Sequence, residues 1–140
     1  MRVVFDTNVV VAGLRSSLGA SHALLQAIPS TKFQIAISVP LYLEYQSVLH
    51  RPGSLPEAMT PADADAVCRF LAANAAHQEI FFLWRPFLPD PKDDMVLELA
   101  VASQSRLIIT HNIADFRAAP AFGVHAIRPG DFIQHIGGLP

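Results

Sequence analysis

Short apolar runs alternate with amphipathic stretches along most of this chain. Five runs of strand-forming apolar residues end at polar or turn-forming positions, and they predict strands over residues 2–5, 33–39, 79–84, 107–109 and 124–127. Helical spacing, capping residues and prolines predict helices after residue 6 and over residues 21–28, 41–49, 61–75 and 93–103. Strands that alternate with helices need crossover connections, so the pattern predicts an α/β fold whose parallel sheet is covered by helices on both faces.

Composition sets the limits within which such a fold must work. The chain has 140 residues, of which 51% are hydrophobic and 16% charged, so it can bury a sizeable core, and we expect one domain over residues 1–140. No apolar run is long enough to cross a bilayer and the N-terminus lacks the features of a secretory signal, so we expect a cytoplasmic protein with no membrane partner. The net charge of −2 gives no general attraction for nucleic acid, which would need local basic residues, a metal ion or both.

Four acidic residues stand at the junctions between predicted elements. Asp6 follows the first strand, Glu44 lies in an apolar helix, Asp94 lies at a helix start and Asp115 follows the fourth strand. A carboxylate in apolar surroundings is costly to desolvate unless it is paired or binds a cation. Sites in parallel α/β sheets lie beyond the carboxyl ends of the strands. We therefore predict that the four carboxylates share one cation site.

Such a site favours a particular kind of ion and reaction. Carboxylates that converge on one pocket repel one another, so the arrangement is favourable chiefly with a divalent cation bound. Oxygen ligands suit Mg²⁺ or Mn²⁺, which also bind phosphate oxygens, and the chemistry expected is phosphoryl transfer to water. Hydroxyl and amide groups beside the acids suit supporting hydrogen bonds, although such residues are also ordinary caps: Thr7, Asn8, Thr110 and Asn112.

Each acid also has an ordinary structural interpretation. Asp6 could cap the first helix, Glu44 could lie on a solvated helix face, and Asp115 could cap a short turn. Asp93 and Asp94 could both simply favour a helix N-terminus. Because neighbouring residues on a helix point in different directions, only one of these two should face the ion. We favour Asp94, with Asp93 as its substitute.

Basic residues near the predicted site could hold phosphates despite the acidic total. They are Arg15, Lys92 and Arg117, and each could equally be an ordinary surface charge. His111, between Thr110 and Asn112, could touch a substrate or simply lie on a surface loop. The sequence contains no zinc-binding histidine spacing and no glycine-rich nucleotide motif, so neither of those site types is supported.

Four motifs spread over residues 3 to about 128 occur in a specific order. They are Val3-Val4-Phe5-Asp6-Thr7-Asn8, Leu43-Glu44, Asp90-Pro91-Lys92-Asp93-Asp94 with Leu97-Glu98-Leu99-Ala100, and Ile109-Thr110-His111-Asn112-Ile113-Ala114-Asp115-Phe116. In this order and spacing they resemble the PIN domain family. Within that family the chain is most similar to the VapC-like toxin components of bacterial toxin–antitoxin pairs.

The resemblance implies a fold, an activity and partners. The fold would be a three-layer α/β/α sandwich with a parallel sheet of about five strands, and the activity that of a Mg²⁺- or Mn²⁺-dependent ribonuclease, a hydrolase of RNA. Its metal-binding and catalytic acids would be Asp6, Glu44, Asp94 (or Asp93) and Asp115. Many relatives carry an acid at the position of Asn112, so here Asp115 would complete the site from one turn later. The resemblance also implies a homodimer that is inhibited by a small antitoxin protein.

Two other functions fit parts of the sequence. A non-catalytic PIN-like scaffold that binds RNA or protein is favoured by the amide at Asn112. A phosphatase could use Asp6 as a covalent nucleophile, since an aspartate follows the first strand in haloacid-dehalogenase-like phosphatases. Such chemistry usually needs an acid two residues later to protonate the leaving group, and that position is Asn8.

Overall fold

Five short strands form one parallel sheet in the order β3-β2-β1-β4-β5. The computed structural model describes residues 1–81 and 87–140. Within them the strands are β1 (Arg2–Phe5), β2 (Gln34–Ile37), β3 (Ala76–His77), β4 (Leu107–Ile109) and β5 (His125–Ile127). The apolar residues of β1 are completely buried, as expected for a central parallel strand with both faces covered.

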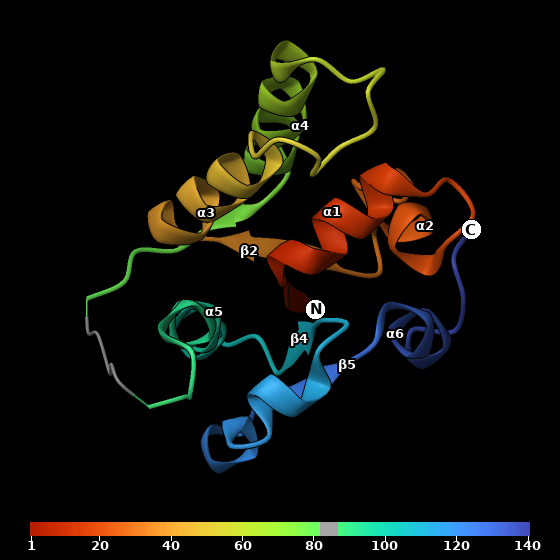
Figure 1. Cartoon of the computed structure of the whole chain (residues 1–140). Coiled ribbons are helices and arrows are strands. Elements are labelled where there is room, and N and C mark those ends of the chain that lie inside the picture. The colour runs from red at the N-terminus through yellow and green to blue at the C-terminus, as the bar shows by residue number, and fades with distance from the viewer. Residues whose placement is uncertain (82–86) are drawn as a thin grey trace.

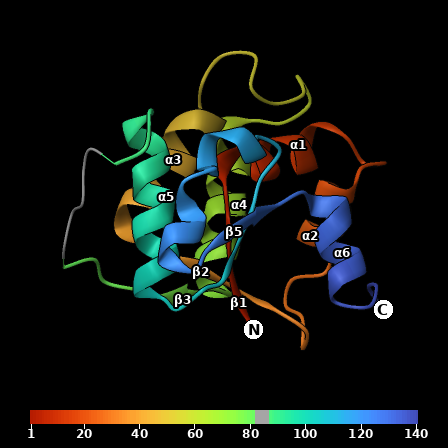
Figure 2. The same ribbon diagram turned by 90° about the horizontal axis from the view of Figure 1, so that it is seen from below.

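Helices cover both faces of this sheet (Figure 1). One face carries α1 (Thr7–Arg15), α2 (Ala20–Gln26), α3 (Val39–Leu49) and α4 (Pro61–Ala73), which connect β1 to β2 and β2 to β3. The opposite face carries α5 (Pro91–Ala102), which packs against β1, β2 and β4, as the view from below also shows (Figure 2). The predicted three-layer α/β/α sandwich with a parallel sheet of about five strands is therefore confirmed.

The direction of strand addition reverses between β1 and β4. From β1 the chain adds β2 and β3 on one side, and then returns through α5 to add β4 and β5 on the other. In the register, Phe5 lies opposite Ile109, and the backbone N–H of Asp6 donates to the Ile109 carbonyl at 2.9 Å. The residues that follow β1 and β4, Asp6 and Thr110, therefore emerge side by side at the point where such sheets usually bind ligands.

The third strand differs from the sequence prediction. That prediction placed it over residues 79–84, whereas β3 is formed by Ala76–His77. Residues 82–84 lie outside the described part of the chain, and the remainder of the run is not a strand. The reason lies in the partner strand, because β2 ends at Ile37, where Ser38 begins to cap α3, and it offers no further backbone for pairing.

The C-terminal part contains helices that the apolar pattern did not predict. They are the short 3-10 helices η1 (Ile113–Phe116) and η2 (Ala119–Phe122) and the helix α6 (Pro129–His135), which packs against α2. Each is anchored by very few apolar side chains, such as the fully buried Phe132 in α6. Among the helices formed by residues 1–81 and 87–140, none is long and apolar enough to span a bilayer.

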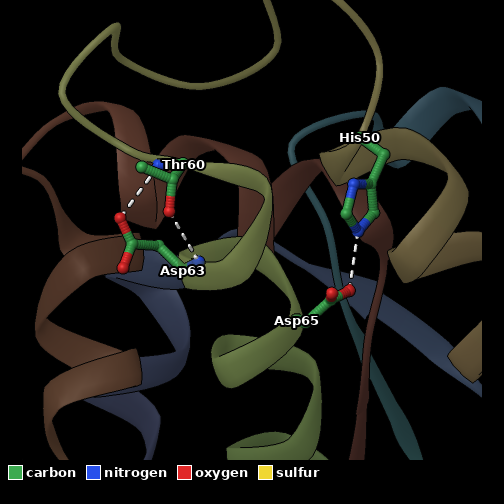
Figure 3. Close-up of polar contacts among 4 residues, drawn as sticks. All are labelled: His50, Thr60, Asp63 and Asp65. Atoms are coloured by element: carbon green, nitrogen blue, oxygen red, sulfur yellow. Dashed lines mark hydrogen bonds and ion pairs between the residues drawn. The ribbon is translucent and has the colours of Figure 1, made fainter.

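The hairpin of α3 and α4 is held by polar contacts near the loop that joins the two helices (Figure 3). Thr60 and Asp63 form a reciprocal capping box that begins α4, with hydrogen bonds of 2.9 and 3.2 Å. His50, at the end of α3, contacts the Asp65 carboxylate of α4 at 2.7 Å. The capping box fixes the start of α4, and the His50–Asp65 contact joins α4 to α3, the helix that carries Glu44.

The crossing of α1 and α2 yields a prediction about stability. A Cβ atom at Gly13 would lie 2.5 Å from Leu25 Cδ1 and 3.0 Å from the Ser21 carbonyl oxygen. We expect Gly13→Ala to lower the free energy of unfolding by about 1–2 kcal/mol, because this overlap outweighs the gain in helix propensity. The matched control is Gly130→Ala in α6, whose nearest neighbour would lie 3.9 Å away, so that it should be neutral or slightly stabilising. Urea denaturation of both variants measures the difference, and equal effects would contradict the close packing.

Candidate functional site

A hollow of about 170 Å³ opens at the carboxyl ends of β1 and β4. We call it the acidic pocket, because five carboxylates from three helices, one strand end and one turn line it: Asp6, Glu44, Asp90, Asp93 and Asp115. Its other lining residues are Thr7, Asn8, Lys92, Met95, Val96 and Asn112. Segments more than 100 residues apart in sequence thus contribute acids to a single space.

Asp6 lies at the base of this pocket and is almost completely buried, with 9% of its surface exposed. Its Oδ1 accepts from the backbone N–H of Thr7 at 2.9 Å, so that it also caps α1. Its Oδ2 accepts from the Thr110 hydroxyl at 2.8 Å and from the Asn8 amide at 3.2 Å. The orientation of the Asp6 carboxylate is therefore fixed from both strands that flank the switch point.

Glu44 approaches the pocket from α3, and the next residue determines its position. Tyr45 is buried, and its hydroxyl donates to the carbonyl of Phe5 at the end of β1. Burial raises the pKa of the Tyr45 hydroxyl well above its ordinary value, so that it remains a donor. Sequence reasoning missed this positioning role, although Tyr45 directly follows the motif Leu43-Glu44.

The structure distinguishes Asp93 from Asp94 and reverses the preference stated from the sequence. Asp93 lines the acidic pocket, whereas Asp94 is 1% exposed and does not. The Asp94 carboxylate accepts hydrogen bonds from the backbone N–H groups of Leu88 at 2.7 Å and of Phe87 at 3.2 and 3.3 Å. It therefore holds the segment that leads into α5, because the first turn of that helix points the two side chains in different directions.

Asp115 reaches the pocket despite its distance from the end of β4. The 3-10 helix η1 turns the chain back after Asn112, so that Asn112 and Asp115 both line the pocket. Beneath them, the Thr110 hydroxyl accepts from the backbone N–H of Asn112 at 3.0 Å. This short helix thus places the Asp115 carboxylate at the pocket together with the Asn112 amide, although Asp115 lies three residues later in the sequence.

Asp90 is the acid that sequence reasoning missed. It caps α5 by accepting from the backbone N–H of Lys92 at 3.0 Å, and it also lines the acidic pocket. The signal available was the sequence Asp-Pro-Lys-Asp-Asp, in which the capping aspartate lies one turn from Asp93.

The pocket carries an uncompensated negative potential. Burial raises the pKa of Asp93 to about 7, and the charges of Asp6, Asp115 and Asp90 add to the rise. Burial also raises the pKa of Asp6, against the opposing effect of the hydrogen bonds from Thr110 and Thr7. Both shifts mean that the pocket favours the addition of positive charge, either as protons or as a cation.

The donors present fit a hard divalent cation. All charged groups of the pocket apart from Lys92 are carboxylates, and the neutral polar donors are hydroxyl and amide groups. Within the described residues, no three Asp, Glu, His or Cys side chains already stand close enough together to form a metal cluster. The space of about 170 Å³ leaves room for a cation with several waters at roughly 30 Å³ each, which suits an ion that retains part of its hydration shell.

The basic residues singled out from the sequence lie in three different settings. Lys92 lines the acidic pocket, and Arg15 lines a neighbouring hollow that also includes His111. Arg117 is exposed, and its Nε donates to the Ala114 carbonyl at 3.2 Å. His111 is exposed as well, but its Nε2 lies 2.8 Å from the Ser21 hydroxyl, which fixes the ring.

The burial of Asp93, together with the charges around it, predicts how stability depends on pH in the absence of metal. An aspartate whose pKa is raised from 3.8 to about 7 on folding favours the folded state only while it is protonated. Stability should therefore fall as the pH rises from about 4 to about 7, because the unfolded chain has then already released this proton. Asp93→Asn should remove part of this fall and raise the melting temperature at pH 8 in the presence of a chelator.

Asp94→Asn is the matched control for that measurement. It should lower the free energy of unfolding by about 1–3 kcal/mol, because it disturbs buried hydrogen bonds to Phe87 and Leu88. Thermal denaturation of the three proteins at pH 5 and pH 8 tests both statements. A variant at Asp93 with the full pH dependence of the original protein would contradict the electrostatic account.

Comparisons with known proteins agree with this architecture. The family model of the PIN domain matches residues 2–114. None of the curated proteins matches the chain. Among solved structures, a chain of VapBC2 from Rickettsia felis, bound to a DNA fragment from the promoter, has a TM-score of 0.64 at 13% identity and covers 91% of this chain and 98% of its own. A chain of FitAB bound to an IR36 DNA fragment has a TM-score of 0.59 at 15% identity, with 91% and 94% covered. At these identities the likeness concerns the fold, whereas the match over residues 2–114 concerns the sequence itself, and the chain belongs to the PIN domain family.

Proposed function

We propose that this protein is a metal-dependent endoribonuclease, a hydrolase that acts on RNA phosphodiester bonds as one nuclease domain over residues 1–140. The observation that carries the proposal is the convergence of carboxylates in the acidic pocket at the switch point of the sheet. The catalytic and metal-binding acids are Asp6, Glu44, Asp93 and Asp115, with Asp93 in the place that sequence reasoning had given to Asp94. Membership of the PIN domain family supports this assignment.

Mg²⁺ or Mn²⁺ is the cofactor that the donor set favours. When bound by these carboxylates, such an ion supplies polarisation of the phosphate and compensation of the negative charge that develops during hydrolysis. The residues of the chain supply the orientation. Thr110, Asn8 and Thr7 hold the carboxylate of Asp6, and the hydrogen bond from Tyr45 to the end of β1 holds the helix that carries Glu44.

Basic and amide groups around the acids provide the remaining contacts to the substrate. Lys92, which lines the pocket, and Arg15, one hollow away, bind phosphates that flank the cleaved bond. Arg117 follows η1 on the surface and extends this set. Asn112 supports the substrate by hydrogen bonding, and Asp115 provides the charge that the amide cannot.

The cellular part of the proposal is a toxin of a bacterial type II toxin–antitoxin pair. It is supported by the fold shared with chains of VapBC2 and FitAB, solved in complexes with DNA fragments. On this proposal the protein acts in the cytoplasm as a homodimer, and a small antitoxin protein inhibits it. RNA is the substrate, and no membrane takes part.

A non-catalytic scaffold is the second candidate, and Asn112 is the observation that favours it. An amide in the lining reduces the charge available to a cation. The phosphatase alternative is less well supported, because the residue two positions after Asp6 is Asn8, whose amide donates to Asp6 and cannot act as the acid that protonates a leaving group.

Loss of one pocket carboxylate should abolish activity without unfolding the protein. We expect Glu44→Gln and Asp6→Asn to lower the rate of metal-dependent RNA cleavage by about a hundredfold or more. Each removes a negatively charged ligand of the cation, and the cation compensates the charge that develops during hydrolysis. Glu57→Gln, an exposed acid outside the pocket, is the matched control and should cleave normally. Cleavage of single-stranded RNA in Mg²⁺ or Mn²⁺ is the measurement, together with bacterial growth on expression. Undiminished cleavage by folded Glu44→Gln protein would remove the basis of the proposal.

Cation binding separates the nuclease from the scaffold. Calorimetric titration with Mn²⁺ should give a saturable signal for the original protein and for Asp94→Asn, since Asp94 lies outside the pocket. The signal should be strongly reduced for Asp93→Asn, which lacks one of the pocket charges. A titration curve that is flat for the original protein, or that is insensitive to Asp93, would favour the scaffold.

A further inference from the structure

A second hollow, of about 570 Å³, lies directly beside the acidic pocket and shares Thr7 and Asn8 with it. We call it the side hollow. Its walls are mostly aliphatic, with Val11 and Ala12 contributed by α1 and Val48 by α3. Its size falls within the range typical of sites for small organic groups.

The two helices that line the side hollow also line the acidic pocket. On α3, Glu44 lines the pocket and Val48 lines the hollow, so one helical turn, about 5 Å along the axis, separates them on the same face. On α1, the same spacing separates Thr7 from Val11. A chain-like ligand that enters the acidic pocket would therefore meet the side hollow one turn further along both helices.

Arg15 and His111 also line the side hollow. The His111 ring is held by the Ser21 hydroxyl at 2.8 Å, and its backbone N–H donates to Asn8 Oδ1 at 3.2 Å. Ser21 is buried, so the ring is fixed against the body of the protein although His111 itself is exposed.

We propose that the side hollow receives an unstacked base of single-stranded RNA next to the phosphate held at the acidic pocket, an inference that rests on the proposed function. A nucleobase is flat and largely apolar on its faces, and proteins that read single-stranded RNA stack such bases on aromatic rings, including histidine, or on guanidinium planes. Aliphatic walls beside the fixed ring of His111 meet that requirement. The acids of the neighbouring pocket repel phosphates unless a cation is bound, so the aliphatic hollow gives the RNA a contact that does not depend on its charge.

Cross-linking locates the base directly and does not depend on cleavage. The probe is a short single-stranded RNA in which one 4-thiouridine is moved along the sequence, bound to the full chain in Ca²⁺, which takes the same class of oxygen ligands. We expect cross-links at one position of the RNA to map by mass spectrometry to Val11, Val48 or His111. Cross-links confined to other parts of the chain, or the absence of RNA binding, would overturn the inference.

A charge placed in the hollow tests its contribution to catalysis. Val48→Glu should lower kcat/KM for a short RNA at least about tenfold, since a small change in an apolar pocket already has effects of that size. Ser47→Glu carries the same charge on the exposed neighbouring position of α3 and should leave kcat/KM near that of the original protein. In the original protein, removal of the base at the cross-linking position of the RNA should reduce kcat/KM by a similar factor. In the Val48→Glu protein it should have little further effect, which a merely structural defect would not produce.

A pair of variants at His111 provides a second measure. His111→Ala and His111→Phe both lose the contact to Ser21, but only the phenylalanine keeps a flat ring. The dependence of kcat/KM on the base should weaken in the alanine variant and persist in the phenylalanine variant. An unchanged dependence in both Val48→Glu and His111→Ala would show that a different surface holds the base and would overturn the inference. Absence of metal-dependent cleavage in the original protein would instead reject the proposed function, while the cross-links in Ca²⁺ would still decide where the base lies.

Discussion

The buried carboxylate of Asp6 is the constraint on which the site depends. It follows the central strand β1 and is almost fully enclosed, so its desolvation would be unfavourable without compensation. Hydrogen bonds from Thr7, Asn8 and Thr110 provide that compensation, and they join the ends of β1 and β4. The same contacts therefore satisfy a buried charge, begin helix α1 and fix the geometry of the switch point. A neutral side chain at this position would fold with less strain, which is why an acid here indicates function more strongly than stability.

The other carboxylates are brought to Asp6 against their mutual repulsion. They come from α3, from the start of α5 and from η1, and apolar packing and hydrogen bonds hold these elements in place. Tyr45 ties α3 to β1, and Asp94 ties the start of α5 to the segment before it. Burial, with a further contribution from the neighbouring carboxylates, raises the Asp93 pKa to about 7. The scaffold thus holds several carboxylates around one pocket, and a cation would reduce their repulsion.

The sequence predicted those features that depend on local pattern. The strands β1, β2, β4 and β5 were recognisable as apolar runs that stop at polar residues, and the acids were recognisable because they interrupt apolar surroundings. Features that depend on contacts between distant segments of the chain were not predictable in this way. The position of β3 follows from where β2 ends, and α6 is held by its packing against α2 and by the buried Phe132. The choice between Asp93 and Asp94 depends on the direction of the first turn of α5, which one residue of difference in the helix start would reverse. Asp90 was not singled out, because its place at the pocket depends on how the chain turns into α5.

Charge imposes a final condition on how such a site can hold RNA. Affinity for nucleic acid usually comes largely from phosphate contacts that release counterions. This chain has a net charge of −2, and its acidic pocket adds a local negative field where the substrate must enter. The few basic residues nearby, Lys92 and Arg15, offer only a small electrostatic contribution. Binding energy must then come from a contact that salt does not screen, and the side hollow is an apolar surface continuous with the acidic pocket. On this account the cation and the acids position the phosphate, while the side hollow holds the base. RNA affinity should therefore depend only weakly on salt concentration.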